Sequence, residues 1–172
     1  MSGVRAYVGL GANLPFEGLE GPALLAAAAR AIEAAGVKVL AISNIWRSAA
    51  WPLSDQPDFF NAVAMVEAGQ RSPRDLYMTL RSIELKFGRE RRERWAARTL
   101  DLDVLAIDGR QGDFGEVTLP HPRMHERAFV LAPLAEVAPH WRHPIAGLTA
   151  AELLKTVPAE QRYRQLGPFP PH

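Results

Sequence analysis

The stretch RTLDLDVLAID, residues 98–108, has the alternation of a β-strand and yet begins with two acids. Read with a period of two, one face carries Leu100, Leu102, Val104 and Ala106, and the other carries Asp101, Asp103, Leu105 and Ile107. Both faces become apolar after the second acid, which predicts a strand covered on both sides by other elements. The two carboxylates then mark the open end of one face.

The composition of the whole chain excludes several classes of protein. A length of 172 residues favours one domain with a substantial core. The net charge of +1 gives no overall attraction to nucleic acid or to an anionic membrane, and the absence of cysteine excludes thiolate sites and disulfides. Because no apolar run approaches the roughly 20 residues of a membrane span and no signal peptide is visible, we expect a soluble, cytoplasmic domain over residues 1–172.

The segments before residue 98 predict alternating strands and helices. Apolar residues at helical spacing favour a helix over 18–35 that Gly36 ends, and a second helix begins at Ser72, where Pro73 and Asp75 complete a capping box. Strands are predicted over 4–11, 37–46 and 61–68, long loops over 47–60 and 88–98, and the end of the second helix at Gly88.

After residue 108 the pattern becomes irregular. A short strand is predicted over 116–119, and helices over 129–137 and 150–155, the second capped by Thr149. Pro133 is tolerable only near the first turn of its helix. The ordered core is expected to cover about residues 3–157, and the Pro-rich C-terminal tail to be flexible.

The order strand, helix, strand, strand, helix, strand is the βαββαβ pattern of a ferredoxin-like sheet. We therefore predict an α+β fold with added strands and helices. Such a fold provides helices against which the strand at 98–108 can be buried.

Asp101 and Asp103 are candidate metal ligands. Their side chains project from one face of the strand about 6 to 7 Å apart, and Mg²⁺ typically takes one or two protein carboxylates together with water and phosphate oxygens. An isolated pair of this kind is more often a solvated strand end. The apolar strand around the pair favours the metal site, because burying unpaired carboxylates is costly.

Five arginines precede the acids, and Trp95 lies among them. Arginines at positions 89, 91, 92, 94 and 98 suit bidentate binding of phosphate, although a charged run is usually a solvated loop. His121 and Arg127 are further candidate donors to a polyphosphate. No P-loop sequence is present, so a nucleotide would bind to another architecture.

Five segments together resemble the 6-hydroxymethyl-7,8-dihydropterin pyrophosphokinase family of folate biosynthesis. They are VGLGAN (8–13), DQPDFFNAV (55–63), ELKFGR (84–89), RWAARTLDLDVL (94–105) and PHPRMHERAFVLAPLAEVAP (120–139). They occur in the order and spacing of the family and span most of residues 5–139.

The resemblance implies a three-layer α/β/α fold and the transfer of pyrophosphate from ATP to the pterin hydroxymethyl group, with release of AMP. It implies that Asp101 and Asp103 bind two Mg²⁺ ions and, with Arg89 and Arg91, form the catalytic set. The positions that match ATP contacts are Arg89, Arg91, Trp95, Arg98, His121 and Arg127, with Glu84, Val104 and Thr118 around the adenine and ribose. The positions that match pterin contacts are the ring-stacking pair Phe59 and Phe129, and the hydrogen-bonding pair Ser48 and Asn61.

These implications agree with the chemistry of the reaction. A flat heterocycle with polar edges suits an aromatic slot and an amide, and attack on phosphorus needs in-line positioning and charge neutralisation. We expect a monomer that acts on two small molecules, binds neither nucleic acid nor membrane, and closes its two long loops over the substrates.

Two other functions fit parts of the pattern. A nucleic-acid-binding module shares the ferredoxin-like topology, but the predicted central strands lack the aromatic residues that stack on RNA bases. A two-metal phosphohydrolase would use the same acids with water as the attacking group and would need no pterin.

Overall fold

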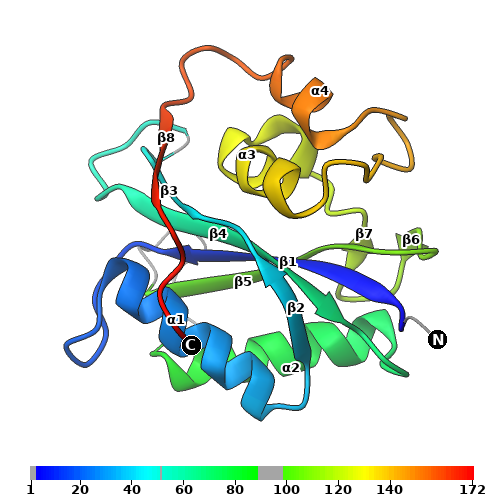
Figure 1. Ribbon diagram of the computed structural model, residues 1–172, viewed down its shortest axis with the longest axis horizontal. Helices are drawn as coiled ribbons and strands as arrows, with labels where there is room; N and C mark the ends of the chain where they lie inside the picture. Colours follow the sequence, from blue (N-terminus) through cyan, green and yellow to red (C-terminus); the bar gives the residue numbers. More distant parts are fainter. Residues whose placement is uncertain (1–2, 51, 89–98) are drawn as a thin grey trace.

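An antiparallel sheet forms the middle layer of the protein (Figure 1). The structure is a computed structural model and describes residues 3–50, 52–88 and 99–172. The strands of the sheet are β1 (Arg5–Ala12), β2 (Lys38–Ile42), β3 (Ile45–Ser48), β4 (Phe59–Glu67), β5 (Leu100–Ile107) and β8 (Tyr163–Gly167). They lie in the order β5-β1-β4-β3-β8, and β2 pairs with the part of β4 that β3 does not reach.

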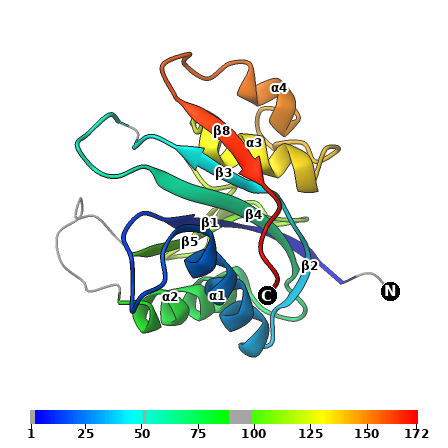
Figure 2. The ribbon, with the colours of Figure 1, turned by 60° about the vertical axis from the view of Figure 1, so that its left-hand side comes forward.

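Helices cover both faces of this sheet (Figures 1 and 2). On one face lie α1 (Gly21–Ala34) and α2 (Pro73–Lys86), and on the other lie α3 (Ala128–Val137) and α4 (Ala150–Leu154). A short helix, η1 (Met124–Glu126), leads into α3, and a small hairpin of β6 (Gly112–Asp113) and β7 (Thr118–Leu119) follows β5. The predicted α+β fold with a βαββαβ core and three layers is confirmed.

The capping box predicted for α2 is present. The backbone N–H of Asp75 donates to the Ser72 hydroxyl at 3.1 Å, and the backbone N–H of Ser72 donates to the Asp75 carboxylate at 3.2 Å. Thr149 caps α4 in the same way, accepting from the backbone N–H of Glu152 at 3.2 Å. These local signals fix where both helices begin.

The two faces of β5 belong to two separate hydrophobic clusters. Leu100, Leu102 and Val104 lie in the cluster under α1 and α2, whereas Leu105 lies in the cluster under α3. The strict alternation predicted from the sequence is wrong at the end of the strand: Ala106 joins the α3 cluster and Ile107 joins the other. The cause is a register shift between β1 and β5, because an extra residue in one strand reverses the faces that follow it.

The predicted strand at 37–46 is two strands, β2 and β3. Ser43 lies between them, and its hydroxyl accepts a hydrogen bond from the backbone N–H of Val63 at 3.0 Å. A side chain thus takes the place of a backbone partner, and the ladder with β4 is interrupted.

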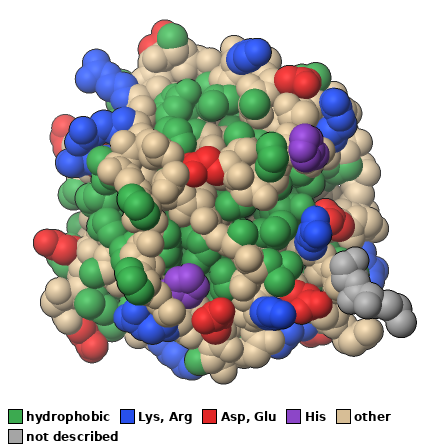
Figure 3. All heavy atoms as spheres, in the orientation of Figure 1, with side chains coloured by type: hydrophobic (Ala, Val, Ile, Leu, Met, Phe, Trp, Pro, Cys, Tyr) green, Lys and Arg blue, Asp and Glu red, His purple; other side chains and the backbone are tan. Residues whose placement is uncertain are grey.

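The C-terminal part of the chain differs most from the prediction. Strand β8 lies beyond residue 157, where the ordered core was expected to end, and it pairs with β3. Phe169 in the tail packs against the cluster under α1 and α2. The C-terminal segment runs towards α1 on the near face in Figure 1, and Figure 3 shows hydrophobic side chains across the middle of this face.

Two smaller features were also unexpected. Strand β6 had no signal in the sequence, and Pro133 lies in the second turn of α3, past the first turn where it was expected to be tolerated. Pro133 removes a helical hydrogen bond to the carbonyl of Phe129, but α3 continues because six of its ten residues are buried. In the described parts of the chain, no helix has the length and apolar character needed to cross a membrane.

Candidate active site

Asp101 and Asp103 lie on the α3 side of β5, each beside a glycine of β1. Gly11 pairs with Asp101, and Gly9 pairs with Asp103. A Cβ atom on Gly11 would lie 3.3 Å from Oδ1 of Asn61 and 3.9 Å from the Cβ of Asp101. The missing side chains leave open space on the sheet between the two acids and β4.

This space is the first cavity, with a volume of about 180 Å³. Its floor is Gly9 and Gly11 with the two acids, and its sides come from β4, the end of β3 and the start of α3. The side residues used below are Ala49, Phe59, Asn61, Arg127 and Phe129. Phe59 and Phe129 thus line one cavity, as the sequence predicts.

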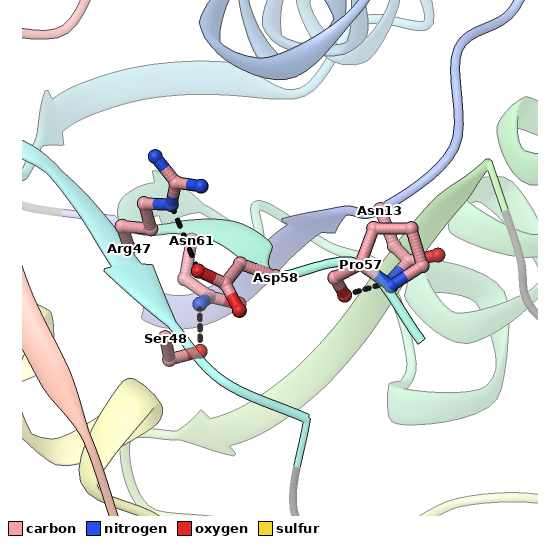
Figure 4. A network of polar contacts seen from close by, with 6 residues as sticks. All are labelled: Asn13, Arg47, Ser48, Pro57, Asp58 and Asn61. Atoms are coloured by element: carbon pink, nitrogen blue, oxygen red, sulfur yellow. Dashed lines mark hydrogen bonds and ion pairs between the residues drawn. The ribbon is translucent and has the colours of Figure 1, made fainter. Parts of the chain in front are cut away.

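Asn61 presents its amide to the cavity in a fixed orientation. Its Nδ2 donates to the Ser48 hydroxyl at 2.8 Å (Figure 4), and both side chains are buried. Oδ1 is the atom nearest to Gly11, so it faces the cavity floor as an acceptor. Ser48 lies behind Asn61 and lines neighbouring hollows rather than the first cavity.

The segment that joins β3 to β4 is held at its two ends, and Ala49 at its start lines this cavity. Arg47 and Asp58 form an ion pair across the two ends of the loop at 3.0 Å, and Nδ2 of Asn13 donates to the carbonyl of Pro57 at 2.6 Å (Figure 4). These contacts set where the loop starts and stops. Closure of this loop over a substrate stays a prediction.

Arg127 brings positive charge to the two acids. It immediately precedes α3, lines the first cavity, and its guanidinium carbon lies 5.6 Å from the centre of the Phe129 ring. Burial lowers the pKa of Arg127, whereas the negative charges of Asp103 and Asp101 act to raise it. Arg127 is therefore placed to bind an anionic group at the carboxylates.

A second cavity, of about 230 Å³, lies along β5, the outer strand of the described sheet. It is lined by Tyr77 of α2, by the stretch from Leu102 to Val104, and by residues 116–118, 121 and 122. Val104, Thr118 and His121, which the sequence predicts at one nucleotide site, therefore share one cavity. Asp103 lines both cavities.

His121 is a neutral hydrogen-bond donor at the second cavity. Burial, together with the charges of Arg127 and Arg123, lowers the pKa of His121 to about 4. Its Nδ1 accepts from the backbone N–H of Arg123 at 3.2 Å, so the neutral ring carries its proton on Nε2. The backbone N–H of His121 donates to the carbonyl of Leu105 at 2.7 Å and fixes the ring beside the edge of β5.

Glu84 is placed differently from the other predicted nucleotide contacts. Its side chain is fully buried between α2 and β5, where it accepts from the backbone N–H of Leu102 at 3.3 Å and lies 3.5 Å from Arg81. The described walls of the second cavity do not include it. Glu84 therefore holds β5 against α2 through its bond with Leu102.

The acids suit a hard divalent cation. Two carboxylates on one face of a strand match the donor set with which proteins hold Mg²⁺ alongside phosphate oxygens; both line the first cavity, and Asp103 also lines the second. Among the described residues no group of three or more metal-ligating side chains occurs. Mg²⁺ at phosphate sites commonly completes its shell with water and substrate oxygens, so a pair of carboxylates is a sufficient protein contribution.

Four of the predicted site residues, Arg89, Arg91, Trp95 and Arg98, lie in the range 89–98, outside the described residues. Arg92 and the loop predicted over 88–98 fall in the same range.

The structure also adds residues that sequence reasoning missed. Gly9 and Gly11 form the cavity floor, and the backbone of Arg123 orients His121. The alternation of glycine with apolar residues in VGLGA was the available signal, because a strand glycine often marks a close approach of a ligand.

Comparison with known proteins finds a protein family that matches this chain. A family model described as 7,8-dihydro-6-hydroxymethylpterin-pyrophosphokinase (HPPK) matches residues 7–139. A protein of Synechocystis named 2-amino-4-hydroxy-6-hydroxymethyldihydropteridine pyrophosphokinase is 42% identical over 88% of this chain and 75% of its own length. A protein of the same name from Pseudomonas aeruginosa is 40% identical over 91% of this chain and 93% of its own length.

Solved structures support the same architecture. A crystal structure of a fused HPPK-DHPS triple mutant from Plasmodium falciparum superposes with a TM-score of 0.69 at 12% identity, over 88% of this chain. This chain spans 44% of that longer protein. At this identity the likeness concerns the fold.

Proposed function

The chain belongs to the 7,8-dihydro-6-hydroxymethylpterin-pyrophosphokinase family, and we propose that the two cavities that meet at Asp103 are its pterin and ATP sites. The enzyme transfers pyrophosphate from ATP to the hydroxymethyl group of 6-hydroxymethyl-7,8-dihydropterin in folate biosynthesis. In this step the hydroxyl oxygen loses its proton and bonds to the β-phosphorus of ATP, the bond from that phosphorus to the oxygen of the α-phosphate breaks, and AMP leaves.

The first cavity suits the pterin. Phe59 and Phe129 both line it, and a flat ring stacked between two aromatic side chains would be shielded from water. Oδ1 of Asn61 faces this space and can accept a hydrogen bond from a ring N–H, while the Ser48 hydroxyl holds the amide in that orientation. Phe59 and Asn61 lie two residues apart in β4, so one aromatic wall and the polar edge of the cavity come from the same strand.

The second cavity suits the nucleotide. His121 can donate from Nε2 to a phosphate oxygen without carrying a charge of its own at neutral pH. Arg127 supplies charge on the other side of Asp103. Arg89, Arg91, Trp95 and Arg98 complete the ATP site in this proposal, with Glu84 at its adenine side, on the basis of the sequence resemblance.

Asp101 and Asp103 fit the role of Mg²⁺ ligands between the cavities. When bound there, Mg²⁺ would neutralise phosphate oxygens and lower the pKa of the pterin hydroxyl. The two acids and Arg127 hold the reacting groups in place and set the local charge. Two ions are proposed because the family resemblance implies them.

The observation that carries this proposal is that Asp103 lines both cavities. A hydroxyl held by the first cavity and a phosphate chain held by the second would meet at this carboxylate. Such positioning is what transfer between two bound substrates requires.

Product analysis tests the proposal. Protein, Mg²⁺, ATP and the hydroxymethyl pterin are incubated together, and the products are followed by phosphorus NMR. We expect AMP and pterin diphosphate, and a fall in kcat of about 100-fold or more for Asp103→Asn, because a carboxylate that acts on the transition state is lost. The exposed Glu33→Gln on α1 is the charge-matched control and should keep full turnover.

Other products would contradict the proposal. ADP, or nucleotide breakdown that does not depend on the pterin, would indicate a phosphohydrolase with water as the attacking group. The monomeric state and the cytoplasmic location stay predictions of the sequence, and the small-molecule substrates follow from the family.

A further inference from the structure

The side-chain amide of Gln161 makes one hydrogen bond on each side of Arg127. Nε2 of Gln161 donates to the carbonyl of Glu126 at 2.6 Å, and the backbone N–H of Ala128 donates to Oε1 at 2.8 Å. Gln161 is only 8% exposed; its bond with Ala128 is buried, and its bond with Glu126 is partly buried. One side chain from a distant part of the sequence thus bonds the backbone of both neighbours of Arg127.

The bond with Ala128 gives a partner to a backbone N–H at the start of α3. Ala128 is the first residue of α3, where a backbone N–H has no partner inside the helix. Arg127, at the N-cap, has no capping side-chain bond of its own and adopts an extended conformation with φ −116° and ψ 109°. Gln161 therefore replaces a local cap and leaves the Arg127 side chain available to the first cavity.

Gln161 is itself held by the sheet. Its backbone N–H donates to the carbonyl of Pro158 at 3.2 Å, which closes a turn. Arg162 follows Gln161 in the chain, and its carbonyl accepts a hydrogen bond from the backbone N–H of Ala49 at 3.2 Å. Ala49 lines the first cavity. The segment that carries Gln161 thus connects the β3 wall of this cavity to the α3 wall.

We propose that Gln161 is a positioning residue for the transfer reaction, which holds the guanidinium of Arg127 in register with Asp101 and Asp103. This inference rests on the proposed function of the first cavity. Gln161 lies beyond residue 139, where the match to the family ends, and the sequence around it carries no catalytic signal.

The test compares Gln161→Ala with the wild-type enzyme, at a temperature well below the melting temperature of both. We expect kcat to fall by about ten-fold, because a small displacement of a charge-bearing group is costly in the transition state. KM for the pterin should change little, since Phe59 and Asn61 are untouched. Gln165→Ala, an exposed glutamine of β8, is the matched control and should keep full kcat.

A second background separates positioning from general stability. In Arg127→Ala, the further change Gln161→Ala should leave kcat unchanged, because there is no guanidinium left to position. If Gln161→Ala keeps wild-type kcat, or lowers kcat equally in both backgrounds, the proposal is wrong.

Should Gln161→Ala fail to fold, Gln161→Glu replaces it in both backgrounds. The carboxylate can still accept from Ala128 but cannot donate to the carbonyl of Glu126, so the same loss and the same dependence on Arg127 are expected. A wild-type enzyme that makes no pterin diphosphate would instead refute the proposed function, so the two failures are distinguishable.

Discussion

At Gly11, a hydrogen atom in place of a side chain keeps the first cavity open between Asp101 and Asn61. Gly11→Ala would place a Cβ atom 3.3 Å from Oδ1 of Asn61. We expect KM for the pterin to rise by about ten-fold or more, since one methyl group in a tight pocket has effects of that size. KM for ATP should stay close to wild type, which steady-state kinetics with each substrate varied in turn would show.

An equal rise of both KM values for Gly11→Ala would mean that the whole sheet had shifted. An unchanged KM for the pterin would show that the ring does not lie on this floor.

The pKa of His121 predicts how the stability of the fold depends on pH. The folded protein takes up a proton at His121 near pH 4, whereas the unfolded chain does so near 6.5. Between these values the unfolded state binds more protons, so the free energy of unfolding falls as the pH is lowered through this window and is fully recovered above it. Urea denaturation should show a shallower fall for His121→Gln than for the wild type.

The matched control is His140→Gln, which replaces an exposed histidine outside both cavities and should leave the fall unchanged. Proton NMR gives a direct check. Imidazole signals of His121 that titrate near pH 6.5 would contradict its burial in a neutral state.

Single residues also mark how far the sequence could predict the site. Asp101, Asp103, Asn61, Phe59 and Phe129 line one cavity. Strand periodicity placed the two acids on one face, and the sequence resemblance alone brought the other three to the same site. The role of Gln161 could not be predicted, because its two partners are backbone groups 33 and 35 residues away. Backbone partners leave no pattern in the side chains of the sequence.

At the scale of elements, local capping signals mark where α2 and α4 start. The capping box of α2 predicts that Ser72→Ala destabilises the protein by about 1 kcal/mol, because the first turn loses one bond to the serine side chain. Ser82→Ala, at an exposed position inside the same helix, should be neutral or slightly stabilising. Chemical denaturation of both variants measures the difference, and an equal stability of the two would show that the box contributes nothing.

Other elements could not be predicted because their cause is not local. The shift that turns Ile107 to the opposite face arises from the pairing of β5 with β1. Strand β8 is exposed along most of its length, and its sequence has no apolar alternation that would predict a strand. It forms by pairing with β3. Both features depend on the assembled sheet.

For the whole molecule, the three layers place two cavities around one strand end. Helix α3 forms a wall of the first cavity, α2 and the segment around β7 form walls of the second, and Asp103 of β5 lines both. Asp101 and Asp103 line the first cavity, and Asp103 also lines the second, because both acids precede the fully apolar part of β5. The two acids of RTLDLDVLAID thus lie where the helical layers do not cover the sheet.

The most direct measurement is a crystal structure of the protein with Mn²⁺, a non-hydrolysable ATP analogue and the hydroxymethyl pterin, with metal located by its anomalous signal. Our account predicts metal at Asp101 and Asp103, the pterin ring between Phe59 and Phe129, and the nucleotide in the cavity of Val104, Thr118 and His121. Nucleotide in the first cavity, or metal away from both acids, would contradict it.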